Sequence, residues 1–165
     1  TLELSPSRYD LMQDVNVRGT FMLTRACLPH LLASDDPRVL TLSPPLNLSP
    51  HWLGQFPGYL LAKYGMTLAT LGLAAEFPQV AANTLWPRTL IATAAIGNTL
   101  GEPALARSRS PRIVADAAHL TLTGPRRSGR TLIDDEVLAE AGITDLSGYS
   151  HLPGATDLQP DVFLD

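Results

Sequence analysis

The sequence predicts an α/β fold in which helices and strands alternate to build a doubly wound parallel sheet. Helical patterns alternate along the chain with short apolar runs, and these runs stop at proline or polar residues. The order helix, strand, helix, strand, helix, strand is typical of a parallel sheet with right-handed crossover connections. Three helices and three strands, followed by an irregular tail, are therefore expected.

The expected helices cover residues 6–32, 59–77 and 111–122, and the expected strands cover residues 38–43, 79–86 and 130–133. The segments 44–58 and 88–110 are predicted to be connections, the second partly helical. The polar, Gly/Pro-punctuated tail from Asp134 onward is predicted to be irregular.

The first helix carries two signals that bear on function. Its residues 15–32 hold only Arg18 and Arg25 as charged side chains, so it is expected to be buried on more than one side. Asn16 lies in the helix interior, where an amide side chain competes with the backbone for hydrogen bonds. Pro29 is expected to bend or end the helix.

Composition excludes several classes of protein. The 165 residues suffice for one domain with a sizeable core, and the net charge of −4, with no basic cluster beyond Arg126 and Arg127, argues against binding nucleic acid or an anionic membrane. The single cysteine, Cys27, excludes an internal disulfide framework and fits a reducing, cytoplasmic location.

No apolar run reaches transmembrane length, and the first residues do not form a signal peptide. The lack of an initiator Met suggests missing sequence upstream. No metal site is expected, because the four histidines stand singly: His30, His51, His119 and His151.

The second helix opens with a phenol and an ammonium group on one face, because Tyr59 and Lys63 are four residues apart. No charged residue follows from Tyr64 to Ala75, so Lys63 is a lone cation in an apolar helix. A nearby cation favours the phenolate form of tyrosine, which makes it a usable acid and base for interconverting a carbonyl and an alcohol. The alternative is an ordinary helix-opening tyrosine beside a lysine that extends to solvent.

Strand ends support the functional interpretation independently. Ser43 ends one predicted strand, Trp86 and Pro87 end the next, and Tyr59 opens the helix between them. Active sites of parallel sheets lie just beyond the carboxyl ends of the strands, so these residues are expected at one edge.

Five stretches together resemble the short-chain dehydrogenase/reductase family, and most closely its hydroxysteroid dehydrogenase-like branch. They are residues 14–20, 42–48, 59–66, 83–87 and 158–165. The resemblance covers nearly the whole chain but only the C-terminal half of a family domain. It implies a Rossmann-type sheet, a nicotinamide cofactor, NADP or NAD, and an alcohol or carbonyl substrate.

The resemblance also implies a role for each matched residue. Tyr59 would exchange a proton with the substrate oxygen, and Lys63 would support the phenolate and hold the nicotinamide ribose. Asn16 would break its helix locally and seat a water molecule in a proton relay. Ser43 would hydrogen-bond the substrate oxygen. The cofactor-contacting set implied in this way is Tyr59, Lys63, Pro87, Ile91 and Thr93.

The chain departs from the family pattern at three places. Pro44 stands where the family usually has its substrate-polarising serine, which leaves Ser49 as an alternative to Ser43. Arg88 replaces the glycine that typically follows the strand-end proline, either near a cofactor phosphate or as a solvated loop residue. The Gly-rich turn that binds the pyrophosphate is absent from these residues.

We therefore predict a catalytic half-domain at residues 1–134 and an irregular tail at residues 135–165 that packs on it. The whole enzyme is expected to be a homodimer or homotetramer paired through the helices at 15–32 and 59–77. Small residues permit close packing there, namely Ala62, Gly65, Ala69 and Gly72. The rival hypothesis is a catalytically silent module that serves oligomerisation or interaction.

Overall fold

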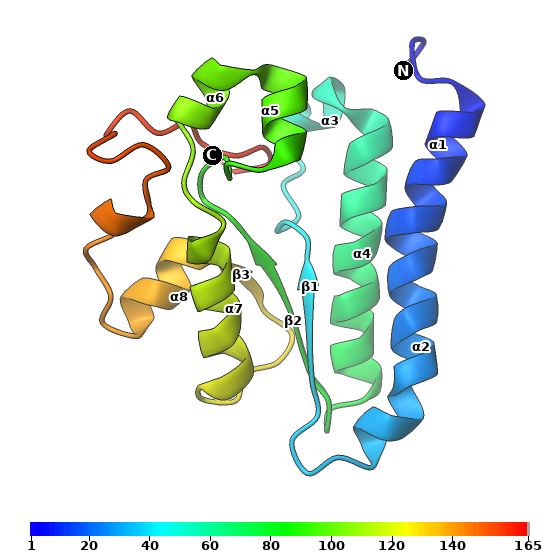
Figure 1. Ribbon diagram of the computed structural model, residues 1–165. Coiled ribbons are helices and arrows are strands. Elements are labelled where there is room, and N and C mark those ends of the chain that lie inside the picture. Colours follow the sequence, from blue (N-terminus) through cyan, green and yellow to red (C-terminus); the bar gives the residue numbers. More distant parts are fainter. Residues whose placement is uncertain (165) are drawn as a thin grey trace. The chain divides into compact units, whose positions relative to one another are not determined.

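The computed structural model describes residues 1–164 and confirms the α/β fold (Figure 1). Its elements, in chain order, are α1 (Pro6–Gln13), the π-helical segment η1 (Asp14–Arg18), α2 (Gly19–Leu32), β1 (Arg38–Leu42), α3 (Pro50–Gln55), α4 (Pro57–Glu76), β2 (Ala81–Trp86), α5 (Ala94–Leu100), α6 (Glu102–Ala106), α7 (Arg112–Thr123), β3 (Thr131–Ile133), α8 (Asp134–Glu140) and a 3₁₀ turn, η2 (Ser147–Tyr149).

The three strands form one parallel sheet in the order β1-β2-β3. The chain divides into two compact units, which are described separately below. Unit 1 comprises residues 1–84 and 126–131, and unit 2 comprises residues 85–125 and 132–164. The long helices α2 and α4 and strand β1 belong to unit 1.

The helix predicted at residues 6–32 is present, but a π-helical segment, η1, interrupts its α-helical winding. Ser5 caps α1, since its side chain accepts a hydrogen bond from the backbone N–H of Arg8, and Pro6 follows at the first helical position. After η1 the helix continues as α2, so that α1, η1 and α2 form one rod beside α4 (Figure 1). Pro29 lies inside α2, which ends only at Leu32.

The core of unit 1 lies where α2 and α4 cover the sheet. Leu73 of α4 packs with Val80 and Ala82, and partly buried apolar side chains surround these three: Leu28, Leu31, Val39, Ala74 and Phe77. The burial expected for residues 15–32 is not found within this chain. No residue of α2 is buried, and Leu23 is 67% exposed, because only one side of the helix meets the rest of unit 1.

Four short helices were not predicted individually. Helix α3 occupies part of the expected loop at 44–58, and α5 and α6 lie within the expected connection at 88–110. The tail expected to be irregular begins with α8, whose first turn carries three acidic residues, a composition that the helix dipole favours at an N-terminus. After α8 the tail has no regular structure in the described residues apart from η2.

The π-helical segment lies directly against α4. A Cβ atom built on Gly65 of α4 would lie 2.7 Å from a methyl group of Val17 in η1, closer than packed carbon atoms approach. Glycine at residue 65 is therefore what lets the two helices come this close.

We predict that Gly65→Ala lowers the free energy of unfolding of the full-length protein by about 1–3 kcal/mol, because Val17 must move to admit the methyl group. The matched control is Gly54→Ala in α3, where a Cβ meets no atom within 4 Å. Because alanine favours helix more than glycine does, the control should hold or raise stability. Equal effects of the two substitutions in urea unfolding would contradict this packing.

Candidate functional site

Helix α4 presents the predicted proton-transfer pair. Pro57 occupies its first turn, so Tyr59 and Lys63 lie on the first two turns. The Lys63 Nζ atom is 6.0 Å from the centre of the Tyr59 ring and donates a hydrogen bond of 3.2 Å to the backbone oxygen of Leu42, the last residue of β1. Both side chains are half-buried. The ammonium group thus lies between the phenol and the carboxyl end of the strand.

Ser43 follows β1 and is fully buried. Its Oγ atom lies 2.9 Å from the Oγ1 atom of Thr67, within hydrogen-bonding distance, and the Thr67 hydroxyl donates to the backbone oxygen of Pro44 at 2.7 Å. The side chain of Ser43 is therefore held against α4. Contact between Ser43 and a substrate stays a prediction, as does the alternative, Ser49, whose Oγ atom is buried without a hydrogen-bond partner.

Asn16 lies in η1, where the backbone departs from α-helical winding, and this agrees with the expected local break of the helix. Its Nδ2 atom donates to the backbone oxygen of Met12, one turn earlier, at 3.0 Å. From the same rod, the Gln13 side chain donates to the backbone oxygen of Gly58 at 3.5 Å. The rod and the start of α4 are thus joined near Tyr59. The role of Asn16 in a proton relay stays a prediction.

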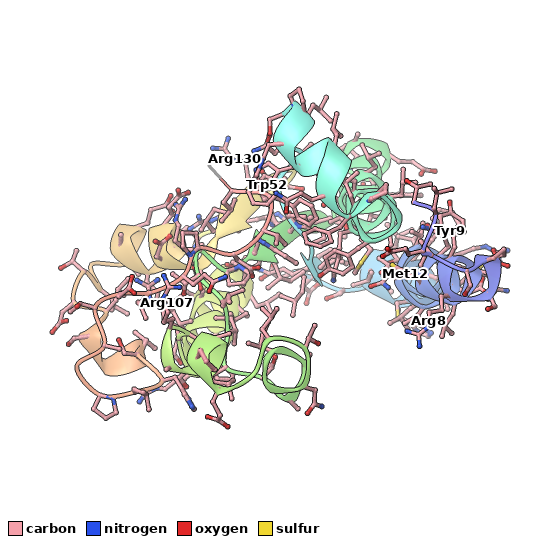
Figure 2. The ribbon with its side chains drawn as sticks, turned by 90° about the horizontal axis from the view of Figure 1, so that it is seen from above. Arg8, Tyr9, Met12, Trp52, Arg107 and Arg130 are labelled. Atoms are coloured by element: carbon pink, nitrogen blue, oxygen red, sulfur yellow. The ribbon has the colours of Figure 1, made fainter. Side chains whose placement is uncertain are left out.

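A shallow pocket lies beside Tyr59 in unit 1. Met12 lines this pocket from α1, and Figure 2 labels it on the side of α1 that faces α4; Trp52 marks α3 in the same view. The pocket is lined by Thr1, Glu3, Leu4, Met12 and residues 55–59. Its wall is mostly apolar, so Tyr59 supplies a phenol at the edge of a hydrophobic surface.

Sequence reasoning missed Tyr64, a buried residue that binds the loop after β1. Its Oη atom donates to the backbone oxygen of Asn47 at 2.6 Å and accepts from the backbone N–H of the same residue at 3.0 Å. The available signal was the spacing of Tyr64, Thr67 and Thr70, which places three polar residues along one side of an otherwise apolar helix.

The other predicted cofactor-contacting residues belong to unit 2. Pro87 follows β2, Ile91 pairs with Arg109 in a parallel bridge, and Thr93 caps α5 by accepting a hydrogen bond from the backbone N–H of Ile96. The segment that contains Ile91 is held by two bridges, because Thr89 also pairs with Pro160 of the tail in an antiparallel bridge.

The tail is fixed to the end of β2 within unit 2. The indole N–H of Trp86 donates to the backbone oxygen of Val162 at 3.1 Å, and the fully buried ring of Phe163 lies with its centre 6.4 Å from that of Trp86. Phe163 has a φ of 71°, a left-handed conformation that is strained for a bulky residue and that burial of its ring offsets. Val162 and Phe163 are thus held against the last residue of β2, while the division of the chain into a half-domain and a tail stays a prediction.

Arg88, which the sequence left open between a phosphate contact and a solvated loop, pairs with acidic residues of α8. Its Nε atom lies 3.1 Å from a carboxylate oxygen of Asp135, and its Nη2 atom hydrogen-bonds Glu136. These carboxylates keep the pKa of the guanidinium above its ordinary value, although desolvation by burial, the largest single influence, acts to lower it.

Asp134 is the buried anchor of this region. One carboxylate oxygen accepts hydrogen bonds of 2.8 Å from the backbone N–H groups of Arg88 and Asp135, while the other, Oδ2, is buried without a partner. Burial of the carboxyl group raises the pKa of Asp134 above its ordinary value. Neutral Asp134 is therefore favoured in the folded protein relative to the unfolded chain.

Within residues 1–164, no three His, Cys, Asp or Glu side chains gather in a way that could hold a metal ion. Over the same residues, every helix is too short or too polar to act as a membrane span.

Solved structures and curated sequences resemble the chain along its length. It is 57% identical to a candidate dehydrogenase from Xanthomonas campestris, with a TM-score of 0.94, over 100% of this chain and 61% of that one. A short chain dehydrogenase from Mycobacterium thermoresistibile is 48% identical, with a TM-score of 0.90, over 99% and 59% of the two chains. No family model matches.

Among curated proteins, hydroxysteroid dehydrogenase-like protein 2 of Homo sapiens is 44% identical over 168 residues, and that of Rattus norvegicus is 45% identical over 167 residues. Each alignment covers the whole of this chain. The chain spans 40% of the human and 32% of the rat protein. The predicted resemblance is thus confirmed: the chain is a homologue of short-chain dehydrogenases and corresponds to part of these longer proteins.

The buried carboxyl group of Asp134 predicts a pH dependence of stability. Because its pKa is raised on folding, its contribution to the free energy of unfolding falls as the pH rises from its ordinary pKa value toward neutrality. Asp134→Asn retains an oxygen for both backbone N–H groups but cannot ionise. The free energy of unfolding of Asp134→Asn, measured in urea with the full-length protein, should therefore equal or exceed that of wild type at neutral pH. The difference between the two proteins should shrink as the pH is lowered into the acid range.

The matched variant Asp134→Ala removes the acceptor and should cost about 1–3 kcal/mol at every pH, since two part-buried N–H groups lose their partner. Parallel pH profiles for Asp134→Asn and wild type would contradict the assigned burial of the charge.

Proposed function

We propose that the protein of which this chain is part is an NAD(P)-dependent oxidoreductase that interconverts an alcohol and a carbonyl compound. The observation that carries the proposal is the pairing of Tyr59 with Lys63 on α4 at the carboxyl end of β1. Homology to short-chain dehydrogenases supports it. Activity, substrate and cofactor of the whole protein are proposed on this basis.

In carbonyl reduction, Tyr59 donates its phenolic proton to the substrate oxygen while the carbonyl carbon receives a hydride. The phenolate left behind is stabilised by the ammonium group of Lys63, because a neighbouring cation favours the charged form of a phenol. In alcohol oxidation the same groups work in reverse, and the phenolate accepts the hydroxyl proton. Asn16, at the break in the rod, is proposed to hold a water molecule that restores the proton.

The proposed cofactor is NADP or NAD, which would supply or accept the hydride when bound, and each unit offers residues that could contact its nicotinamide end. Lys63 is half-buried rather than enclosed, and Thr93 is exposed at the first turn of α5, so both can receive a ligand. In unit 1 we propose Lys63 as the residue that holds the ribose. In unit 2 the family resemblance implies that Ile91 and Thr93 contact the carboxamide. Dehydrogenases of similar fold have been solved with NADP, at 24% identity, and with NADH, at 17% identity.

A second candidate function is a catalytically silent module, favoured by the buried, paired hydroxyl of Ser43 beside Pro44. In such a module no hydroxyl would be needed to polarise a substrate. The experiment below separates the two functions.

The proposed chemistry predicts that Tyr59→Phe in the full-length protein nearly abolishes reduction of an aromatic quinone such as phenanthrenequinone, by about a hundredfold or more, because only the proton donor is lost. NADPH affinity, measured by fluorescence titration, should stay close to normal. Lys63→Ala should lower both turnover and cofactor affinity, because Lys63 has both roles. Wild-type-like turnover by Tyr59→Phe would contradict the mechanism, and lack of turnover by wild type over a carbonyl panel would favour the silent module.

We further propose that the whole protein pairs with itself through α2 and α4. A groove between the two helices is lined by residues of both, among them Phe21, which is 55% exposed. Leu68 of α4, the residue before the lining residue Ala69, is 57% exposed. Of the small residues in α4, Ala62 is fully buried and Gly65 meets Val17, whereas Gly72 meets no neighbouring side chain. A two-fold axis would bring the same exposed faces of two subunits together.

This pairing predicts that Leu68→Arg converts the full-length oligomer into monomers or aggregates, because an unpaired charge would be buried between subunits. Leu152→Arg, which places the same charge on an exposed leucine of unit 2, is the matched control and should leave the assembly intact. Light scattering measures the molar mass of wild type and of both variants. A wild-type protein that is monomeric at micromolar concentration would exclude the interface.

A further inference from the structure

The segment that joins β1 to α3, residues 43–49, has no regular secondary structure, yet it begins at the strand end that Lys63 contacts. Segments of this kind usually owe their shape to side chains from neighbouring elements, because their backbone groups lack a ladder or helix to pair with. Several hydrogen bonds that fix this segment come from α4.

Tyr64 holds the segment at its middle. The phenol oxygen donates to the carbonyl of Asn47 and accepts from the N–H of the same residue, at 2.6 Å and 3.0 Å, and only 6% of Tyr64 is exposed. Two bonds to one residue fix both the position and the orientation of its peptide groups. The Oδ1 atom of Asn47 in turn accepts from the N–H of Ser49 at 3.0 Å and closes a local turn.

A second anchor lies one turn further along α4. Thr67, three residues after Tyr64, donates to the backbone oxygen of Pro44 and meets the hydroxyl of Ser43. Residues three apart on a helix lie on one side, so Tyr64 and Thr67 together form a continuous contact surface for the segment. Lys63 immediately precedes Tyr64, so the ammonium group and the anchor are parts of the same turn of helix.

We propose that Tyr64 is a positioning residue for the reaction: it holds residues 44–49 in the shape that presents this segment to the substrate carbonyl beside Tyr59. The inference rests on the proposed function. Pro44 occupies the place where a polarising serine is expected, and the hydroxyl of Ser43 is buried, so recognition of the substrate depends on how the segment beyond Ser43 is arranged. Tyr64 acts through this segment and makes no contact with the cofactor in the proposed scheme.

The test is Tyr64→Phe in the full-length protein, which keeps the ring and removes both hydrogen bonds to Asn47. Two quantities are measured: amide hydrogen exchange at Asn47, and steady-state reduction of phenanthrenequinone together with NADPH affinity. The matched control is Tyr149→Phe, which removes a phenol that donates to Asp116 in unit 2 at 2.7 Å.

The proposal predicts faster exchange at Asn47 and a fall of about tenfold in kcat/KM for the quinone, mainly through KM. The dissociation constant for NADPH should stay within about twofold of the wild-type value, because the cofactor contacts are untouched. Tyr149→Phe should change neither the exchange at Asn47 nor the kinetics. A purely structural role would instead alter cofactor and quinone parameters together or lower only the melting temperature.

Wild-type kinetics in Tyr64→Phe would overturn the proposal, as would a loss of NADPH affinity equal to the loss of kcat/KM. Either result leaves the proposed oxidoreductase function intact, because that function is judged on wild-type turnover and on Tyr59→Phe. If wild type reduces no carbonyl compound, the positioning role fails together with the function, whereas exchange at Asn47 still shows whether Tyr64 anchors the segment.

Discussion

The register of α4 against β1 depends on a few buried hydroxyl groups. Thr67 binds Ser43 and Pro44, and one turn later the hydroxyl of Thr70 meets that of Thr41 in the strand at 2.8 Å, all of them buried. If α4 slid along the sheet by one turn, these hydroxyls would lose their partners, at a cost of about 1–3 kcal/mol for each buried group left unpaired. The same register places Lys63 within hydrogen-bonding distance of the last residue of β1. The position of Lys63 near the start of α4 is thus set in part by polar contacts in the middle of the helix.

The rod formed by α1, η1 and α2 adds a second constraint. Gly65 allows Val17 to approach α4 closely, and the π-helical winding places Asn16 in the segment that makes this approach. The irregular turn and the glycine therefore act together: the close contact holds η1 in place beside the helix that carries Tyr59. π-Helical turns occur frequently at functional sites, which agrees with the role proposed for Asn16.

Much of the fold could be predicted from the sequence, because long periodic patterns and proline breaks mark α4, β1 and β2 clearly. The short helices could not be predicted, since α3 and α8 depend on contacts as much as on composition. Helix α8 starts at Asp134, whose carboxylate accepts a hydrogen bond from the backbone N–H of Arg88, 46 residues earlier in the chain.

The pair Tyr59 and Lys63 could be predicted because helical spacing alone brings the two together. The partner of Tyr64 could not, because Asn47 lies 17 residues away and no local pattern links them. Burial of Ser43 likewise depends on Thr67, a contact across 24 residues.

The central claim is that the charge of Lys63 makes Tyr59 an effective acid and base. The most direct measurement is the pH dependence of alcohol oxidation by the full-length protein at saturating cofactor, for wild type and for Lys63→Met. The oxidation rate requires the phenolate, so it should rise with pH. Loss of the ammonium group removes what stabilises that phenolate, so the rise should move to higher pH in the variant. A variant whose rate is lower but rises over the same pH range as wild type would contradict the claim.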